Sequence, residues 1–210
     1  MGGRLIVMLV RAFIVVAVLA APLSVRAQSN GPDTAQQSRL ASGASDLAMG
    51  PQVGDWSLQL SGSFFRESWD LNVFREQLAG ASASAFRQLT PRWAIGFEID
   101  LLHVRQNPLK DVLLPAANVL LRWSALQLGK TVVFIEGGGG LSYASGMVPN
   151  EGTQFNFISQ TGVGLLRPVS PRVYLLGGAR WLHVSNNGLD GSRRNPDIQA
   201  LGLYVGWSIH

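Results

Sequence analysis

The fold is decided by the stretch Trp93-Ala94-Ile95-Gly96-Phe97-Glu98-Ile99-Asp100-Leu101. Successive side chains of a β-strand point to opposite faces, so every second residue shares a face. One face of this stretch is apolar, and it carries Trp93, Ile95, Phe97, Ile99 and Leu101. The other face carries Gly96, Glu98 and Asp100. The stretch therefore predicts a β-strand with lipid or a core on one side and a polar environment on the other.

The rest of the chain repeats this pattern in short segments separated by turn residues. Each segment is near the ten or so residues that a tilted membrane strand needs. We predict eight strands, at about 55–65, 77–89, 93–105, 114–124, 131–143, 153–166, 172–185 and 197–209. Tight turns at 90–92, 128–130 and 169–171 alternate with longer loops at about 66–76, 106–113, 144–152 and 186–196. Short periplasmic turns and long outer loops are typical of outer-membrane barrels.

Alternation in the other segments supports an all-β fold, an eight-stranded antiparallel transmembrane β-barrel of the outer-membrane type. A closed barrel in lipid needs apolar side chains outside and polar ones inside. Eight strands leave an interior that side chains fill, so a wide pore is not expected. We expect Arg122 to pair inside the barrel with Glu98, Asp100 or Glu136.

The rival interpretation is a soluble β-sandwich or lipocalin-like barrel, whose apolar face points inward. Charged residues on the face opposite the apolar one favour the membrane barrel, as do tryptophans near strand ends. Two features depart from the pattern. The run 79–85 is small on both faces and cannot be assigned, and the sequence ends in Ile209-His210, where outer-membrane barrels usually have an aromatic residue.

The first 27 residues have the features of a cleaved signal peptide. Arg4 and Arg11 precede the apolar run 12–23, and small residues lead to Ala27. The alternative is an uncleaved anchor, but residues 12–25 are too few for the roughly 20 that a membrane helix needs. Residues 28–54 are polar and aperiodic and are predicted to be a flexible leader. The β-barrel domain is expected over residues 55–210.

The charge and the cysteine content limit where the protein is located and which partners it can have. Residues 1–27 hold three of the 17 Lys and Arg and none of the 13 Asp and Glu, leaving 14 bases against 13 acids. The mature chain is thus nearly neutral, and no nucleic-acid-binding motif is present. There is no cysteine, which excludes disulfides, thiol redox chemistry and thiolate metal sites. An exported, glycine-rich chain of this kind is predicted to lie in the bacterial outer membrane.

The candidate chemistry lies in the run Trp181-Leu182-His183-Val184-Ser185-Asn186-Asn187-Gly188 and at Asp197. His183 and Ser185 have the parity of the apolar face of their strand. Asp197 has the parity of Leu201, Leu203 and Val205 on the next strand. Polar groups on the lipid-facing wall are costly and usually functional. A base, a nucleophile and an acid near the outer end of the wall could meet an ester bond of a lipid.

The same residues resemble the signature of the lipid A 3-O-deacylases (PagL-type). That family consists of eight-stranded outer-membrane barrels that remove an ester-linked acyl chain from lipopolysaccharide. Its motif is His-x-Ser-Asn with a glycine shortly after and an acid on the next strand. His183, Ser185, Asn186 and Gly188 match it, and Asp197 stands at the acidic position. The resemblance is specific over about 172–209.

The resemblance implies a serine hydrolase. Ser185 would be the nucleophile, His183 the base and Asp197 the group that orients the imidazole. The Asn186 side chain and the Gly188 N–H would receive the oxyanion. No metal and no cofactor is expected. The family more often carries glutamate where this chain has Asp197, so the reach of this carboxylate is the open point, and Asp190 is the substitute acid.

Further residues receive weaker assignments. Arg193 and Arg194 are candidates to bind lipopolysaccharide phosphates, or they are simply solvated loop charges. His103 also has outward parity, and no partner is evident from the sequence.

The predicted function is an outer-membrane esterase acting on the 3-O acyl chain of lipid A in the outer leaflet. The alternatives are a non-enzymatic structural or adhesive small barrel, or an esterase or phospholipase that acts on glycerolipids. The preferred acyl length, a homodimer and latency of the activity in the native membrane are left open by the sequence.

Overall fold

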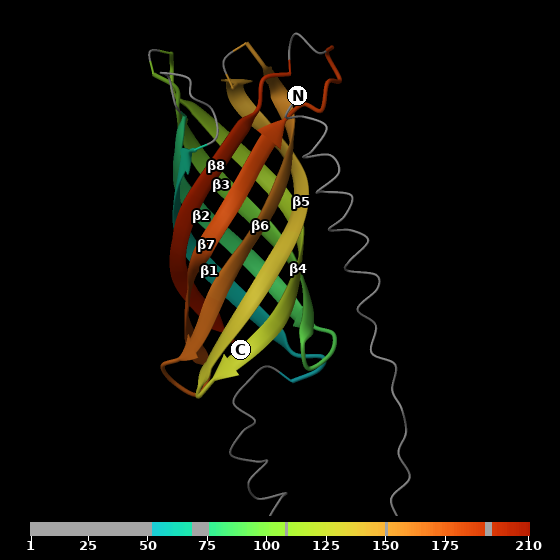
Figure 1. Ribbon diagram of the computed structural model, residues 1–210, viewed down its shortest axis with the longest axis vertical. Helices are drawn as coiled ribbons and strands as arrows, with labels where there is room; N and C mark the ends of the chain where they lie inside the picture. The colour runs from blue at the N-terminus through green and yellow to red at the C-terminus, as the bar shows by residue number, and fades with distance from the viewer. Residues whose placement is uncertain (1–51, 69–75, 108, 150, 192–194) are drawn as a thin grey trace, which may run out of the picture. The chain divides into compact units, whose positions relative to one another are not determined.

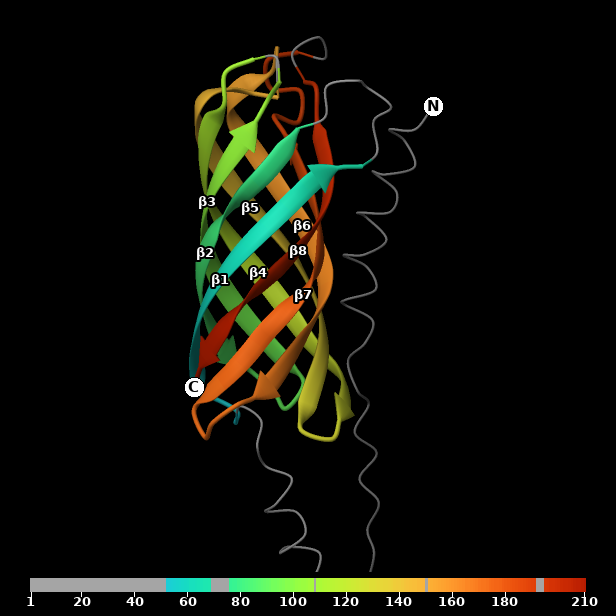
Figure 2. The same cartoon turned by 90° about the vertical axis from the view of Figure 1, so that its left-hand side faces the viewer.

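The computed structural model describes residues 52–68, 76–107, 109–149, 151–191 and 195–210. Eight antiparallel strands form a closed barrel in sequence order, with the last strand paired to the first (Figures 1 and 2). The strands are β1 (Trp56–Glu67), β2 (Gln77–Gln88), β3 (Trp93–Arg105), β4 (Val112–Leu128), β5 (Thr131–Val148), β6 (Thr153–Pro168), β7 (Val173–Ser185) and β8 (Ile198–Ile209). Fold class and strand count are as predicted.

The two ends of the barrel differ. At one end, which we call the turn end, β2–β3, β4–β5 and β6–β7 are joined by connections of two to four residues. The opposite, loop end holds connections of four to twelve residues, and the longest of them joins Ser185 to Ile198. No helix among the described residues is long and apolar enough to cross a membrane.

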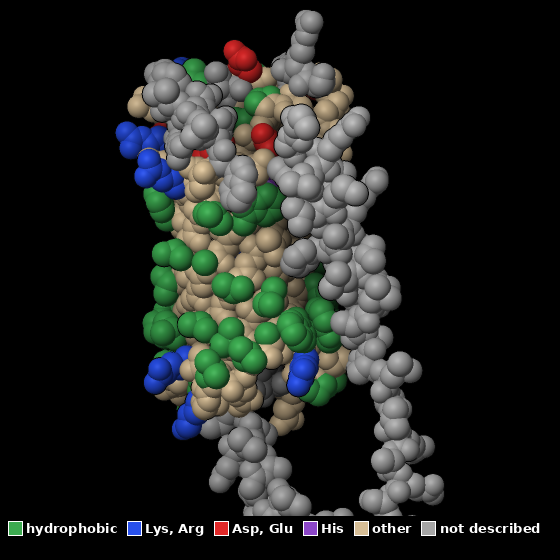
Figure 3. All heavy atoms as spheres, viewed as in Figure 1, with side chains coloured by type: hydrophobic (Ala, Val, Ile, Leu, Met, Phe, Trp, Pro, Cys, Tyr) green, Lys and Arg blue, Asp and Glu red, His purple; other side chains and the backbone are tan. Residues whose placement is uncertain are grey.

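Burial alternates along the strands as the sequence pattern requires. In β3 every second residue from Ala94 to Val104 is buried, and Ile95, Phe97, Ile99 and Leu101 are exposed. On the face shown in Figure 3, apolar side chains lie over the middle of the barrel and charged side chains lie near the two ends. These apolar side chains are exposed, so burial in a protein core cannot stabilise them; Leu203, for example, is 69% exposed. They fit a lipid environment instead.

The interior is filled by a network of charged and polar side chains. Arg122 donates to Glu136 Oε2 at 2.8 Å, which is one of the three pairings predicted from the sequence. Arg180, which the sequence analysis did not single out, bridges Glu136 Oε1 at 2.7 Å and Glu98 Oε1 at 2.8 Å. The Tyr204 hydroxyl donates to the same Glu136 oxygen at 3.0 Å. Described side chains of this network thus occupy the interior of the barrel.

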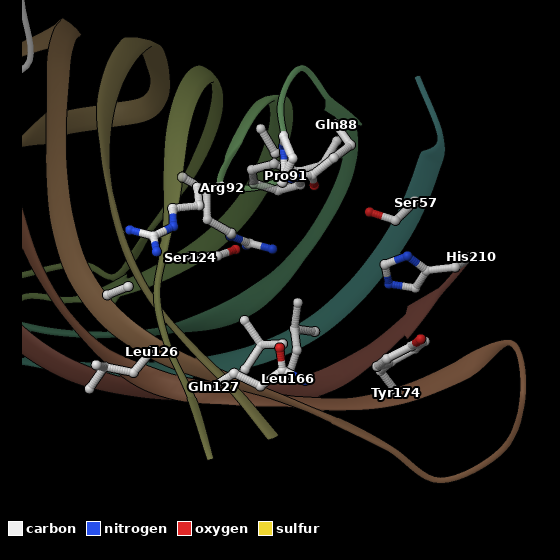
Figure 4. A pocket seen from close by; sticks show the side chains of 15 residues that line it. Ser57, Gln88, Pro91, Arg92, Ser124, Leu126, Gln127, Leu166, Tyr174 and His210 are labelled. Carbon is white, nitrogen blue, oxygen red and sulfur yellow. The ribbon is translucent and has the colours of Figure 1, made fainter. Parts of the chain in front are cut away.

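A cavity of about 270 Å³ lies at the turn end, and Arg122 of the network is among its lining residues (Figure 4). Ser57, Gln88, Arg92, Tyr174 and His210 are among its lining residues. The His210 ring packs 4.4 Å from the Tyr174 ring and lies 2.8 Å from the Ser208 hydroxyl. Burial, with the nearby Arg122 guanidinium, lowers the pKa of His210. The C-terminal histidine therefore lies against the barrel mouth, where the sequence pattern had suggested only a departure from the usual aromatic end.

The structure places one run whose two faces the sequence left unassigned, and it extends one predicted strand. The run 79–85, which could not be assigned, lies in β2, with Ala79, Ala81 and Ala83 outside and Ser82 inside. The Ser82 hydroxyl and the Asn118 amide both donate to the interior carboxylate of Asp100. Strand β5 continues to Val148, so part of the predicted loop 144–152 is strand. The predicted signal peptide and nearly all of the leader lie outside the described residues.

Candidate active site

His183 and Ser185 lie at the end of β7, at the loop end of the barrel, and both face outward by their position in the strand. The His183 Nε2 atom lies 3.0 Å from Ser185 Oγ, a hydrogen-bond distance. Because His183 and Ser185 are two residues apart on a strand, their side chains point to the same face and come into contact. His183 is 22% exposed and the whole Ser185 residue only 7%. A hydroxyl beside an imidazole nitrogen is the arrangement that a nucleophile and its base require.

The other ring nitrogen of His183 faces Asp197. Strand register pairs Val184 with Ile198 and His183 with Gln199, so Asp197 comes just before β8 and beside the end of β7. Its Oδ2 lies 3.5 Å from His183 Nδ1. This separation is an ion-pair distance, longer than an ordinary hydrogen bond, and Nδ1 has no hydrogen-bond partner among the described residues. The acid is near its expected position but is loosely engaged.

Two residues that the sequence analysis missed support this pair. Gln199 donates from Nε2 to Asp197 Oδ2 at 2.9 Å, which holds the carboxylate close to β8. Trp181 stacks on the imidazole, with ring centroids 5.7 Å apart and planes 13° apart. Each follows from the parity rule, because Trp181 lies two residues before His183 and Gln199 two residues after Asp197. This signal was available in the sequence.

The chain after Ser185 turns sharply. Asn187 and Gly188 have φ of 54° and 76°, and the Leu189 N–H donates to the Asn186 carbonyl at 3.2 Å. Positive φ at both central residues is the signature of a type I′ turn, which Asn-Gly favours. Asn186 is 2% exposed. The turn therefore begins at Asn186, the residue that follows the predicted nucleophile Ser185.

The Gly188 N–H, which was predicted to receive the oxyanion, has a hydrogen-bond partner in this structure. The Gly188 N–H donates to Asn186 Oδ1 at 2.9 Å, so in this structure it is directed at the asparagine. A donor engaged in this way is not presented to a substrate. The contact instead fixes the amide group, whose Nδ2 end is the donor end.

The remaining expected site residues lie elsewhere. Asp190 is exposed in the loop, and the carboxylate paired with His183 belongs to Asp197. Arg193 and Arg194 lie outside the described residues. His103, for which no partner was evident, lies 3.2 Å from Asp111 at the loop end of β3. No group of three or more potential metal ligands occurs among the described side chains.

Comparisons with known proteins identify the family of the chain and support its fold. The family model of lipid A 3-O-deacylase (PagL) matches residues 51–208. The structure of the outer membrane protein OprG from Pseudomonas aeruginosa superposes with a TM-score of 0.52 at 10% identity, covering 77% of this chain and 97% of OprG. Neisserial surface protein A gives 0.53 at 16% identity, covering 73% and 96%. At these identities the two structures support the outer-membrane barrel fold alone. No curated protein matches the chain.

Proposed function

Because the chain belongs to the lipid A 3-O-deacylase (PagL) family, we propose that it hydrolyses the ester bond holding the 3-O acyl chain of lipid A. The observation that carries the proposal is the 3.0 Å contact between His183 Nε2 and Ser185 Oγ on the outward-facing wall. A site that opens to the wall, and not to the lumen, suits an acyl chain that stays in the bilayer. The proposed location is the outer membrane, with the loop end at the lipopolysaccharide leaflet.

The proposed reaction proceeds through an acyl-enzyme. His183 Nε2 accepts the Ser185 proton as Oγ attacks the ester carbonyl. Collapse of the tetrahedral intermediate breaks the bond to the sugar oxygen, and His183 returns the proton to that leaving hydroxyl. Water then attacks the acyl-serine with the same base, which releases the fatty acid and restores Ser185. Asp197 stabilises the imidazolium that forms in both steps.

Asn186 is the proposed oxyanion donor, through its side-chain Nδ2. The Gly188 N–H holds the amide oxygen at 2.9 Å and thereby directs the Nδ2 end. We therefore assign Gly188 a positioning role. Arg193 and Arg194 remain candidate ligands of lipid A phosphates, since arginine binds phosphate with two parallel hydrogen bonds. The comparisons do not support a homodimer, which the sequence left open.

The function is tested with purified full-length protein in detergent and lipopolysaccharide of known acylation. The expected product is a free 3-hydroxy fatty acid, detected by mass spectrometry, with a lipid A that is lighter by one hydroxyacyl group. A parallel incubation with glycerophospholipid tests the phospholipase alternative. Lysophospholipid in place of the deacylated lipid A would overturn the assigned substrate. Neither product from folded protein would favour a non-enzymatic barrel.

Replacing Asn186 with alanine is expected to lower kcat by about 10²- to 10³-fold, the usual effect of removing one oxyanion donor. KM should change little, because the interaction is made mainly in the transition state. Steady-state kinetics on the purified variant measures both constants. The control is Asn187→Gly, which keeps the positive φ of the turn and removes an exposed amide. A loss carried by KM alone would contradict the oxyanion role.

Asp197→Glu is expected to keep the activity within about tenfold of wild type or to raise it. Glutamate is longer by one C–C bond, about 1.5 Å, and the present carboxylate lies 3.5 Å from Nδ1. Asp197→Ala is expected to lower kcat by about 10²-fold or more, yet by less than the loss of Ser185. The same kinetic assay compares the two variants. Equal activity of Asp197→Ala and wild type would remove Asp197 from the mechanism.

A further inference from the structure

Five basic side chains surround the turn end of the barrel and have no partner in the mechanism above. They are Arg87, Arg92, Lys130, Arg167 and Arg172. They come from the three tight connections and the strand ends beside them, and all five are exposed. We call this set the basic collar. Figure 3 shows basic side chains and no acidic ones on the visible face at this end.

Acidic side chains are scarce around the collar in the described part of the chain. Asp55 is the acidic side chain next to the turn-end strand termini, and none of the five bases forms an ion pair among the described residues. The loop end is different, because exposed Arg66, Arg105 and Lys110 are mixed there with exposed acids, including Asp111, Glu151 and Asp190. Like charges gathered around one rim repel one another unless an external anion neutralises them.

The collar lies at the level where lipid headgroups are expected. Trp56, 58% exposed, starts β1 at the turn end, and the Arg87 guanidinium carbon lies 5.8 Å from its ring centroid. Trp93 and Trp123 pair nearby, with ring centroids 6.3 Å apart. Tryptophans of this kind mark the interface between hydrocarbon and headgroups. The Arg87 guanidinium beside Trp56 is therefore within reach of headgroup phosphates.

We propose that the basic collar binds the phosphodiester headgroups of anionic phospholipids in the leaflet at the turn end. Arginine is suited to this because its planar guanidinium matches phosphate with two hydrogen bonds. The inference depends on the membrane-spanning barrel and is independent of the deacylase activity. The collar would then bind phospholipid at the turn end, in addition to the lipid A substrate proposed at the loop end.

Native mass spectrometry tests the proposal with full-length protein in micelles containing equal amounts of phosphatidylglycerol and phosphatidylcholine. Wild type should retain phosphatidylglycerol in about tenfold excess, the combined effect of several weak charge contacts. The fivefold variant R87Q/R92Q/K130Q/R167Q/R172Q should retain both lipids about equally. The matched control R66Q/R105Q/K110Q removes three bases from the loop end and should behave as wild type. No preference in wild type, or an equal loss in the control, would overturn the proposal.

A second measurement uses wild type alone, in case the fivefold variant does not fold. A photoreactive phosphatidylglycerol is incorporated into vesicles with the protein, irradiated, and its attachment sites are mapped by peptide mass spectrometry. Cross-links within about 87–92, 129–131 and 167–172 support the collar. Cross-links confined to the loop end would overturn it.

Discussion

Replacing Ser185 with alanine is expected to lower the release of the hydroxyacyl chain by about 10⁴- to 10⁶-fold, close to the uncatalysed background. Without Oγ no acyl-enzyme forms, and the contact of 3.0 Å to His183 Nε2 is lost. His183→Ala should cause a loss of similar size, because an unassisted hydroxyl attacks esters poorly. The double variant should be no worse than either single variant, since the two residues act as a unit.

The control for this prediction is Ser145→Ala, which removes another exposed serine on the outer wall near the loop end, in β5. Its activity should stay within about twofold of wild type. Folding of every variant is checked by its heat-dependent migration on a gel, which reports the closed barrel. Full activity in folded Ser185→Ala would require a different nucleophile. A severe loss in Ser185→Ala with an unchanged His183→Ala would contradict the assigned base.

Glu136→Ala is expected to have the largest effect on stability, a loss of about 3–5 kcal/mol in the free energy of unfolding. Glu136 accepts from Arg122 at 2.8 Å and from Arg180 at 2.7 Å, and all three side chains are almost fully buried. Its removal leaves two guanidinium groups inside the barrel with less compensating charge. Arg180 still reaches Glu98 at 2.8 Å, so Arg122 loses the most.

Urea unfolding of the reconstituted barrel, followed by tryptophan fluorescence, measures this change. Glu136→Gln should be intermediate, because it keeps the side-chain shape and loses the charge. Asp190→Ala, which removes an exposed loop acid, should change the free energy of unfolding by less than about 0.5 kcal/mol. A loss below about 1 kcal/mol for Glu136→Ala would show that the interior network contributes little to stability.

The barrel could be predicted from sequence because lipid outside and a filled lumen impose a period of two on nearly every strand. The prediction was incomplete where that contrast is weak. Strand β2 carries small residues on both faces, and β5 extends past residue 143, through an irregularity between Tyr143 and Val148, where the apolar signal ends. The parity of Arg180 in β7 matches that of buried Tyr174 and Leu182 and places it inside, but its pairing with both Glu98 and Glu136 was not predicted.

The candidate site was also predictable in part. Parity placed His183, Ser185 and Asp197 on one wall, and the resemblance to a family gave them roles. The 3.5 Å separation of Asp197 from His183 depends on how β8 begins relative to the end of β7. The hydrogen bond from Gly188 to the Asn186 side chain depends on a rotamer within the turn. Neither quantity has a sequence signal of its own.

The central claim is that this barrel removes the 3-O acyl chain of lipid A through Ser185. It is tested most directly by the mass spectrum of lipid A from bacteria that express wild-type protein or Ser185→Ala in the outer membrane. The expected result is a loss of one hydroxyacyl group with wild type and an unchanged lipid A with Ser185→Ala. Unchanged lipid A with folded wild-type protein present in the membrane would contradict the claim, as would the same loss with Ser185→Ala.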